Sequence, residues 1–190
     1  ADSRGMSKVL DWQDRFKELN QGKNIDEQTS LLNEYADKKT KLDTPREYLD
    51  EPIDRAAMEA RVKQIETELP PDDLARLQQS HKELVLDFNS KQLDEDVASG
   101  LRSPEEAARL RITNPNYSKL IVRDYLEDAV SRGVARRDAK GITFNGRKTE
   151  APLDSKTLPP TEANIIGSFM RERQRARNTE TLTILDADAR

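Results

Sequence analysis

The 190-residue sequence contains no cysteine and only one histidine. The lack of cysteine excludes disulfide bonds, thiolate catalysis and zinc sites built on Cys, and it fits a reducing compartment. A single histidine, His81, nearly excludes Ser-His and Cys-His nucleophile systems. We therefore expect no enzyme, no metal site and no cofactor. An enzyme built on a pair of the abundant carboxylates is a minor alternative.

Apolar residues are scarce as well. Hydrophobic residues make up 34% of the sequence and aromatic residues 5%, whereas 36% of residues are charged. Such a chain cannot fill a thick core, and long helices with one narrow apolar stripe suit it best. No apolar run approaches the roughly 18 residues of a membrane span, and no signal-peptide pattern is present. We expect a cytoplasmic protein without membrane contacts.

Apolar residues in the first half recur at steps of three and four, the spacing of one helix face. The first stripe comprises Val9, Trp12, Phe16 and Leu19, and the last comprises Leu74, Leu77, Leu84 and Phe88, with His81 at a packing position between them. Pro45, Pro70 and Pro71 mark short connections, which imply antiparallel neighbours. The pattern predicts an acidic antiparallel helical bundle over residues 6–93, elongated and coiled-coil-like.

The second half has a different pattern. We expect a short helix after Ser103, a helix over residues 116–132, and a short β-hairpin formed by "VARRDAKGITFN". These elements would make a small helical domain over residues 94–148. Residues 149–190 would follow as a linker, a terminal helix that frays at "RERQRAR", and a basic tail. The predicted fold is mainly α with one hairpin.

Charge is distributed unevenly along the chain. Residues 1–100 hold 15 Lys/Arg and 23 Asp/Glu, whereas residues 101–190 hold 17 and 13, which gives net charges of −8 and +4. This asymmetry indicates either a partner for the basic half or attraction between the two halves. The sequence leaves both interpretations open.

The first functional hypothesis is a non-enzymatic scaffold or adaptor. The stripes Val9/Trp12/Phe16/Leu19 and Leu74/Leu77/Leu84/Phe88 would bind another protein or a second copy of the chain. This hypothesis depends on the regular stripe spacing and on the lack of a catalytic set.

The alternative is a nucleic-acid-binding accessory protein, because helix, turn, helix and basic hairpin follow one another as in a winged-helix module. Residues 130–149 would form the basic contact, and acidic Asp124, Glu127 and Asp128 on the helix argue against it. The candidate phosphate contacts are Lys119, Arg123, Arg132, Arg136, Arg137, Lys140, Arg147 and Lys148.

Overall fold

The structure is a computed structural model that describes residues 2–45, 52–116, 135–138, 141–144, 147–148 and 160–188. Helix accounts for most of these residues, in agreement with the predicted fold class. Within the described ranges, no helix combines the length and the apolar character needed to cross a bilayer.

The first three helices are α1 (Asp2–Leu19), α2 (Ile25–Asp43) and α3 (Arg55–Glu68). Gly22 turns the chain after α1 with φ 78°, a conformation that favours glycine. The side chain of Asn24 then caps α2 by accepting hydrogen bonds from the backbone amides of Asp26 and Glu27. Helices α2 and α3 pack as an antiparallel pair, in which Arg61 donates to Glu34 with Nε–Oε1 at 2.8 Å.

The next three segments form one long helix: α4 (Pro71–His81), the π-helix η2 (Lys82–Asp87) and α5 (Phe88–Ala98). After a turn at Gly100, α6 (Pro104–Thr113) folds back onto α5. Helix α1 runs antiparallel to this long helix, because Asn20 contacts Ser80 and Trp12 contacts Leu84. The predicted antiparallel arrangement is therefore present between these segments.

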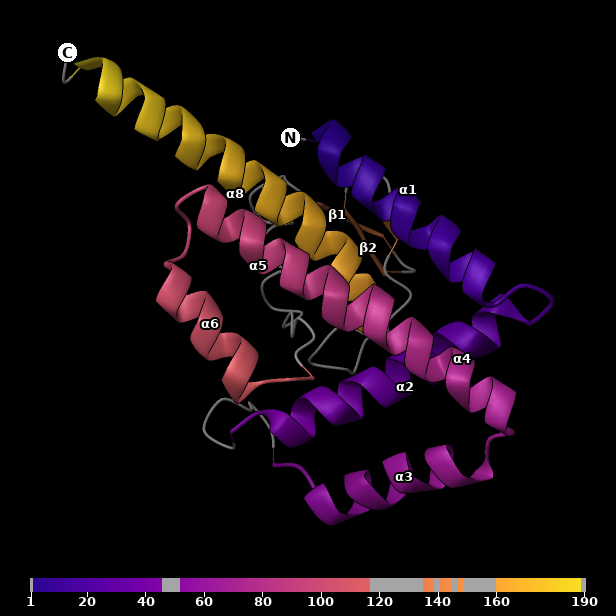
Figure 1. The fold of residues 1–190 in the computed structure, drawn as a ribbon. Coiled ribbons are helices and arrows are strands. Elements are labelled where there is room, and N and C mark those ends of the chain that lie inside the picture. Colours follow the sequence, from indigo (N-terminus) through magenta and orange to yellow (C-terminus); the bar gives the residue numbers. More distant parts are fainter. Residues whose placement is uncertain are drawn as a thin grey trace.

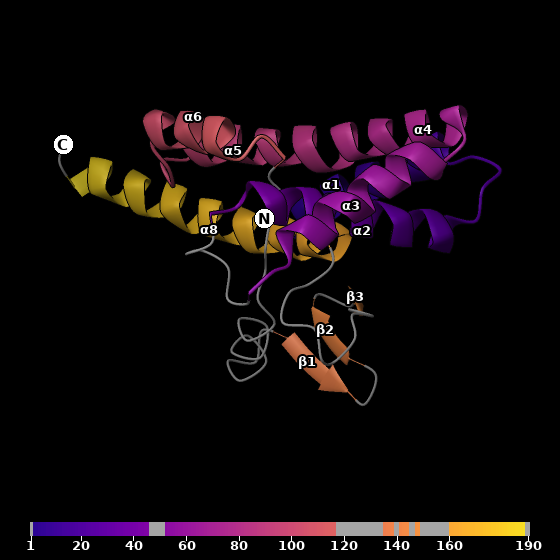
Figure 2. The same cartoon turned by 90° about the horizontal axis from the view of Figure 1, so that it is seen from below.

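The last helix, α8 (Pro160–Asp188), lies along both α1 and α5. It runs parallel to α5, because Asn164 contacts Asn89 and Asn178 contacts Ser99. Figure 1 shows α8 beside α5, and Figure 2 shows α4, α5 and α6 as an upper layer with α8 beneath α5. In both views the C-terminal end of α8 projects beyond α5 and α6.

The main apolar cluster lies where α1, α2, α3, α4 and η2 meet. Its described members are Trp12, Phe16, Leu32, Tyr35, Ala36, Val62, Ile65, Leu77, Leu84 and Val85. Trp12 and Phe16 stack with their ring centroids 5.5 Å apart. The stripes that the sequence analysis identified thus provide much of this core.

A small antiparallel sheet lies below the helices in Figure 2. Its strands are β1 (Ala135–Asp138), β2 (Gly141–Phe144) and β3 (Arg147–Lys148), in the order β1-β2-β3. Strands β1 and β2 occupy the stretch for which the sequence predicts a hairpin. The helix expected over residues 116–132 lies, except for Asn116, outside the described residues.

The terminal helix differs from the expectation. The sequence predicts fraying at residues 171–177, but α8 continues to Asp188. Within the stretch expected to fray, Arg171 and Arg175 bind the buried carboxylate of Asp96 on α5. The proposed units 6–93, 94–148 and 149–190 stay a prediction, although the boundary at 93 falls within α5 and α8 packs on α1.

Candidate partner-binding groove

The face of α8 that meets α5 is polar. Asn164, Ser168, Glu172 and Arg175 recur at steps of three and four, and all four are buried. Such a face cannot pack against an apolar surface without leaving polar groups unpaired. Its partners on α5 and α1 must therefore be polar too.

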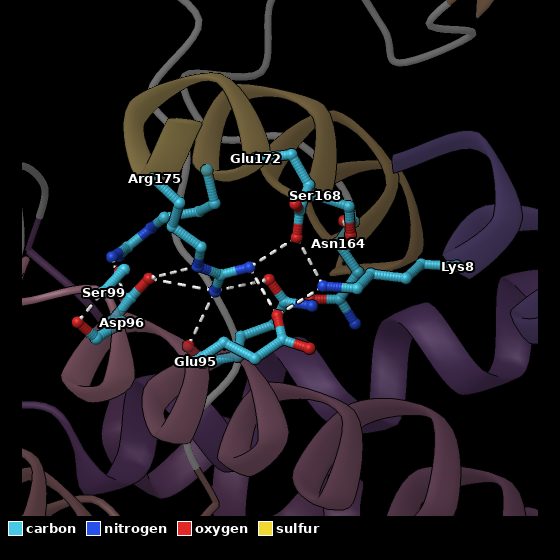
Figure 3. Close-up of polar contacts among 10 residues, drawn as sticks. Lys8, Glu95, Asp96, Ser99, Asn164, Ser168, Glu172 and Arg175 are labelled. Carbon is cyan, nitrogen blue, oxygen red and sulfur yellow. Dashed lines mark hydrogen bonds and ion pairs between the residues drawn. The ribbon is translucent and has the colours of Figure 1, made fainter. Parts of the chain in front are cut away.

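Arg175 is the centre of this interface and is only 7% exposed. Its Nη2 donates to Asp96 Oδ1 at 2.9 Å and to the backbone carbonyl of Gln92 at 2.7 Å. Its Nη1 donates to Glu172 Oε1 at 2.7 Å and also to Glu95. The guanidinium thereby joins α8 to α5 through several directed bonds (Figure 3).

The charges around Arg175 balance. The bases are Lys8, Arg171 and Arg175, and the acids are Glu95, Asp96 and Glu172. Asp96 is 1% exposed and accepts from Arg171 and Arg175. Because the six charges sum to zero, no net charge is buried between α1, α5 and α8. We call these six residues the ionic cluster.

Glu172 remains ionised within the cluster. Burial opposes its ionisation, but the hydrogen bond from Lys8 and the positive charges of Lys8 and Arg175 outweigh burial, so the pKa of Glu172 is lowered. Lys8 comes from α1 and also contacts Glu95 on α5. One side chain therefore connects all three helices.

The π-helix η2 lies next to the ionic cluster. A π-helical turn alters the usual backbone ladder and leaves carbonyl groups that need other donors. Trp12 Nε1 donates to the Leu84 carbonyl at 2.7 Å, and Asn164 Nδ2 donates to the same oxygen at 3.2 Å. Helices α1 and α8 thus both satisfy the backbone at this point.

Two neighbouring hollows lie along α1 and the long helix. The larger, of about 920 Å³, lies between the N-terminal part of α1, the end of α5 and α8. The smaller, of about 600 Å³, lies between α1 and η2–α5, and its lining includes Trp12 and Phe88. Lys8 and Glu95 line both hollows, and we call the two hollows together the groove.

Charged pairs of both signs form the walls of the groove. Arg15 Nε contacts Glu83 Oε2 at 2.6 Å, and Lys82 Nζ contacts Asp87 Oδ2 at 2.8 Å. The hydrogen bonds from Arg15 and Gln79 lower the pKa of Glu83 to about 2. Glu83 is therefore ionised at pH 7, and the two pairs give the walls charges of both signs.

The structure covers most of the stripe residues with the chain itself. Val9, Trp12, Phe16, Leu77 and Leu84 are buried, and Leu19, Leu74 and Phe88 are partly buried. A partner of this folded form cannot contact the fully covered side chains. All three of Trp12, Leu84 and Phe88 line the smaller hollow, and of these Phe88 is partly exposed.

The predicted nucleic-acid contacts divide into two groups. Arg136 and Arg137 lie on β1, and Arg147 and Lys148 lie on β3. Arg136, Thr143 and Lys148 form one row across the sheet, and Phe144 pairs with Arg147 in the next row. Lys119, Arg123, Arg132 and Lys140 lie outside the described residues.

His81 occupies the packing position that its spacing predicts. It is 5% exposed, and its ring meets the Tyr35 ring edge-on with centroids 5.2 Å apart. Burial, with a smaller effect of the Lys39 ammonium, lowers the pKa of His81 to about 4. The imidazole is therefore neutral at pH 7.

Sequence reasoning missed the ionic cluster. It predicted that the helix frays at "RERQRAR", whereas Arg171 and Arg175 in this stretch both reach Asp96. The available signal was the spacing of Asn164, Ser168 and Glu172, which continues the apolar face of α8 with polar residues. A periodic polar face is easily taken for a solvent-facing one.

The described residues contain no group of three or more His, Asp or Glu side chains arranged to hold a metal ion. No protein family, curated protein or solved structure matches the chain.

Proposed function

We propose that the chain is a non-enzymatic interaction module, an adaptor or scaffold, that binds a segment of a partner protein in the groove between α1 and η2–α5. The observation that supports this proposal most directly is the pair of neighbouring hollows, of about 920 and 600 Å³, that share Lys8 and Glu95. A groove between helices is a common receptor for a helical peptide.

The lining of the groove indicates the chemistry of the bound segment. Phe88, together with the small exposed part of Trp12, would contact an apolar side chain of the segment. The charged pairs Arg15–Glu83 and Lys82–Asp87 would select charges on either side of that side chain. We therefore expect an amphipathic helix with charges of both signs rather than a strongly acidic or basic segment. Large aromatic anchors commonly dominate the energy of such contacts.

A selection from a library of helical peptides tests the proposal. Peptides are selected on the intact chain and then measured against Ala98→Trp, which places a bulky ring in the larger hollow, and against Ala108→Trp on α6. Both alanines are exposed helix positions, and only Ala98 lines the groove. We expect Ala98→Trp to weaken binding at least about tenfold and Ala108→Trp to leave it unchanged. Equal binding to both variants would contradict the groove.

A second candidate is binding of a nucleic-acid backbone by the sheet. The observation that favours it is the register, which groups Arg136 with Lys148 across one row and Arg147 beside Phe144 in the next. Basic residues that neutralise phosphates give an affinity that falls steeply with salt. An aromatic position among them fits stacking on a base.

Fluorescence anisotropy with a labelled oligonucleotide at two salt concentrations tests this candidate. The variant Arg136→Ala/Arg137→Ala/Lys140→Ala should bind more weakly at low salt and should show a smaller salt slope. The matched control removes the same charge from exposed helix positions as Lys17→Ala/Lys63→Ala/Arg109→Ala. An intact chain without affinity at low salt would exclude this function.

A further inference from the structure

Helix α8 contributes no described member to the main apolar cluster. The described members of that cluster all belong to α1, α2, α3, α4 and η2. The partly buried residues packed against it, such as Leu42, Leu69 and Phe88, also come from the first hundred residues. The first part of the chain therefore has a continuous apolar core of its own.

Many of the side chains that attach α8 to the other helices are polar. The described apolar residues on the attached side are Pro160, Ala163, Ile166 and Gly167, which are buried, and Ile165 and Met170, which are partly buried. The other buried residues of this face are Thr161, Asn164, Ser168, Glu172 and Arg175. Their bonds reach Asn33 on α2, the Leu84 carbonyl on η2, and Asp96 on α5.

Polar and ionic contacts of this kind specify geometry more than they add stability. A buried ion pair roughly balances its desolvation cost, and a neutral hydrogen bond adds only about 1 kcal/mol. The detachment of α8 should therefore require less free energy than the unfolding of the apolar cluster. Many proteins have such segments, which open locally while the rest of the molecule stays folded. The core that remains would retain its packing.

The surface left by α8 would need a specific replacement. Asp96 would lose the partners Arg171 and Arg175, and the Gln92 carbonyl would lose a donor. A replacement helix must therefore place an amide near η2 and a guanidinium near Asp96, about 11 positions further along, which is the distance from Asn164 to Arg175. The helix that meets these demands is α8 itself.

We infer that α8 is exchanged between two copies of the chain, so that α8 of each copy docks on α1 and α5 of the other. In the exchanged dimer, α8 makes the same contacts as in a monomer whose α8 docks on its own chain. Exchange is therefore a low-cost route to a dimer. Its population should rise with protein concentration by mass action. This inference is independent of the groove proposed above, because α8 borders the groove in either form.

Cysteine crosslinking distinguishes the two forms, since the chain has no cysteine of its own. Asn178 on α8 contacts the Ser99 carbonyl after α5. The variant Ser99→Cys/Asn178→Cys is incubated over an about hundredfold range of concentration and treated with a short bifunctional thiol reagent. Denaturing electrophoresis then separates the products.

We expect a covalent dimer whose share grows with concentration. The control Glu34→Cys/Arg61→Cys joins α2 to α3, which do not exchange, and should give only crosslinked monomer. If Ser99→Cys/Asn178→Cys gives only crosslinked monomer at every concentration, the exchange is refuted.

Hydrogen exchange on the unmodified chain provides an independent measurement. The amides of α8 near Asn164–Arg175 should exchange at least about tenfold faster than those of α2 near Leu32–Ala36, because undocking precedes unfolding of the core. Equal protection of the two helices would show that α8 opens only with the whole molecule, and it would overturn the inference.

Discussion

Arg175 and Asp96 are the residues on which the position of α8 depends most. Both are nearly inaccessible, at 7% and 1% exposure, and their opposite charges are matched within a cluster of zero net charge. Replacing only one residue of such a buried pair costs much stability, because the charge of the other residue is left without an adequate partner. The pair therefore fixes how α8 sits on α5.

Single and double substitutions at this pair should be strongly non-additive. Asp96→Asn and Arg175→Met should each lower the free energy of unfolding by about 3–5 kcal/mol. The double variant Asp96→Leu/Arg175→Met preserves the charge balance and should lose less than either single change. Urea unfolding of the variants checks this. Additive losses would show that the two side chains act separately.

His81 makes the stability of the folded chain depend on pH. Its folded pKa, about 4, lies below the ordinary 6.5 because burial disfavours the imidazolium. The unfolded chain thus binds more protons between these values, and stability that is complete above pH 6.5 is lost as the pH falls towards 4. The full effect is about 3 kcal/mol.

The variant His81→Leu isolates this effect, because it keeps an apolar side chain against Tyr35 and removes the titration. Its free energy of unfolding should change less between pH 6.5 and 4 than that of the unmodified chain. Urea unfolding at several pH values gives the comparison. If both chains lose the same free energy over this interval, other groups are responsible.

At the scale of elements, the long helix through α4, η2 and α5 depends on donors from two other helices. The sequence predicts one helix over Leu74, Leu77, Leu84 and Phe88, and the structure inserts a π-helical segment into it. The spacing alone gives no sign of this change, because the apolar steps continue through it. The Leu84 carbonyl is satisfied by Trp12 and Asn164, which are remote in sequence.

Trp12→Phe should test the support of this segment. The substitution keeps an aromatic ring beside Phe16 but removes the donor to Leu84, and we expect a loss of about 1–2 kcal/mol in the free energy of unfolding. In an Asn164→Ala background the same change should cost more, because the carbonyl then loses both side-chain donors. Equal costs in both backgrounds would mean that solvent replaces the indole N–H.

At the scale of the whole molecule, part of the charge asymmetry is satisfied internally. Arg171 and Arg175 from the basic half bind Glu95 and Asp96 from the acidic half. Conversely, the base Lys8 from the acidic half binds the acid Glu172 from the basic half. Attraction between the halves was one of two interpretations that the sequence left open. These contacts leave less positive charge on α8 for an external partner.

The end of α8 should be dispensable for the bundle. Asn178 donates to the Ser99 carbonyl, and Figures 1 and 2 show the end of α8 projecting beyond α5 and α6. A chain that stops after Thr181 should keep its free energy of unfolding within about 0.5 kcal/mol. Denaturant unfolding measures this. A larger loss would reveal a contact beyond Thr181.

The sequence by itself determined the helices of the first half, because the regular apolar steps from Val9 to Phe88 specify which face of each helix is buried, whatever that face contacts. It also determined the caps at Asn24 and Ser103, which are local hydrogen bonds. Only the tertiary structure decided the role of α8, since Arg171 and Arg175, in a stretch that looks solvated and basic, both bind Asp96, which lies 75 positions or more away. The sequence alone does not show whether a polar helix face is buried, because its burial depends on whether residues of matching charge lie opposite it in the folded chain.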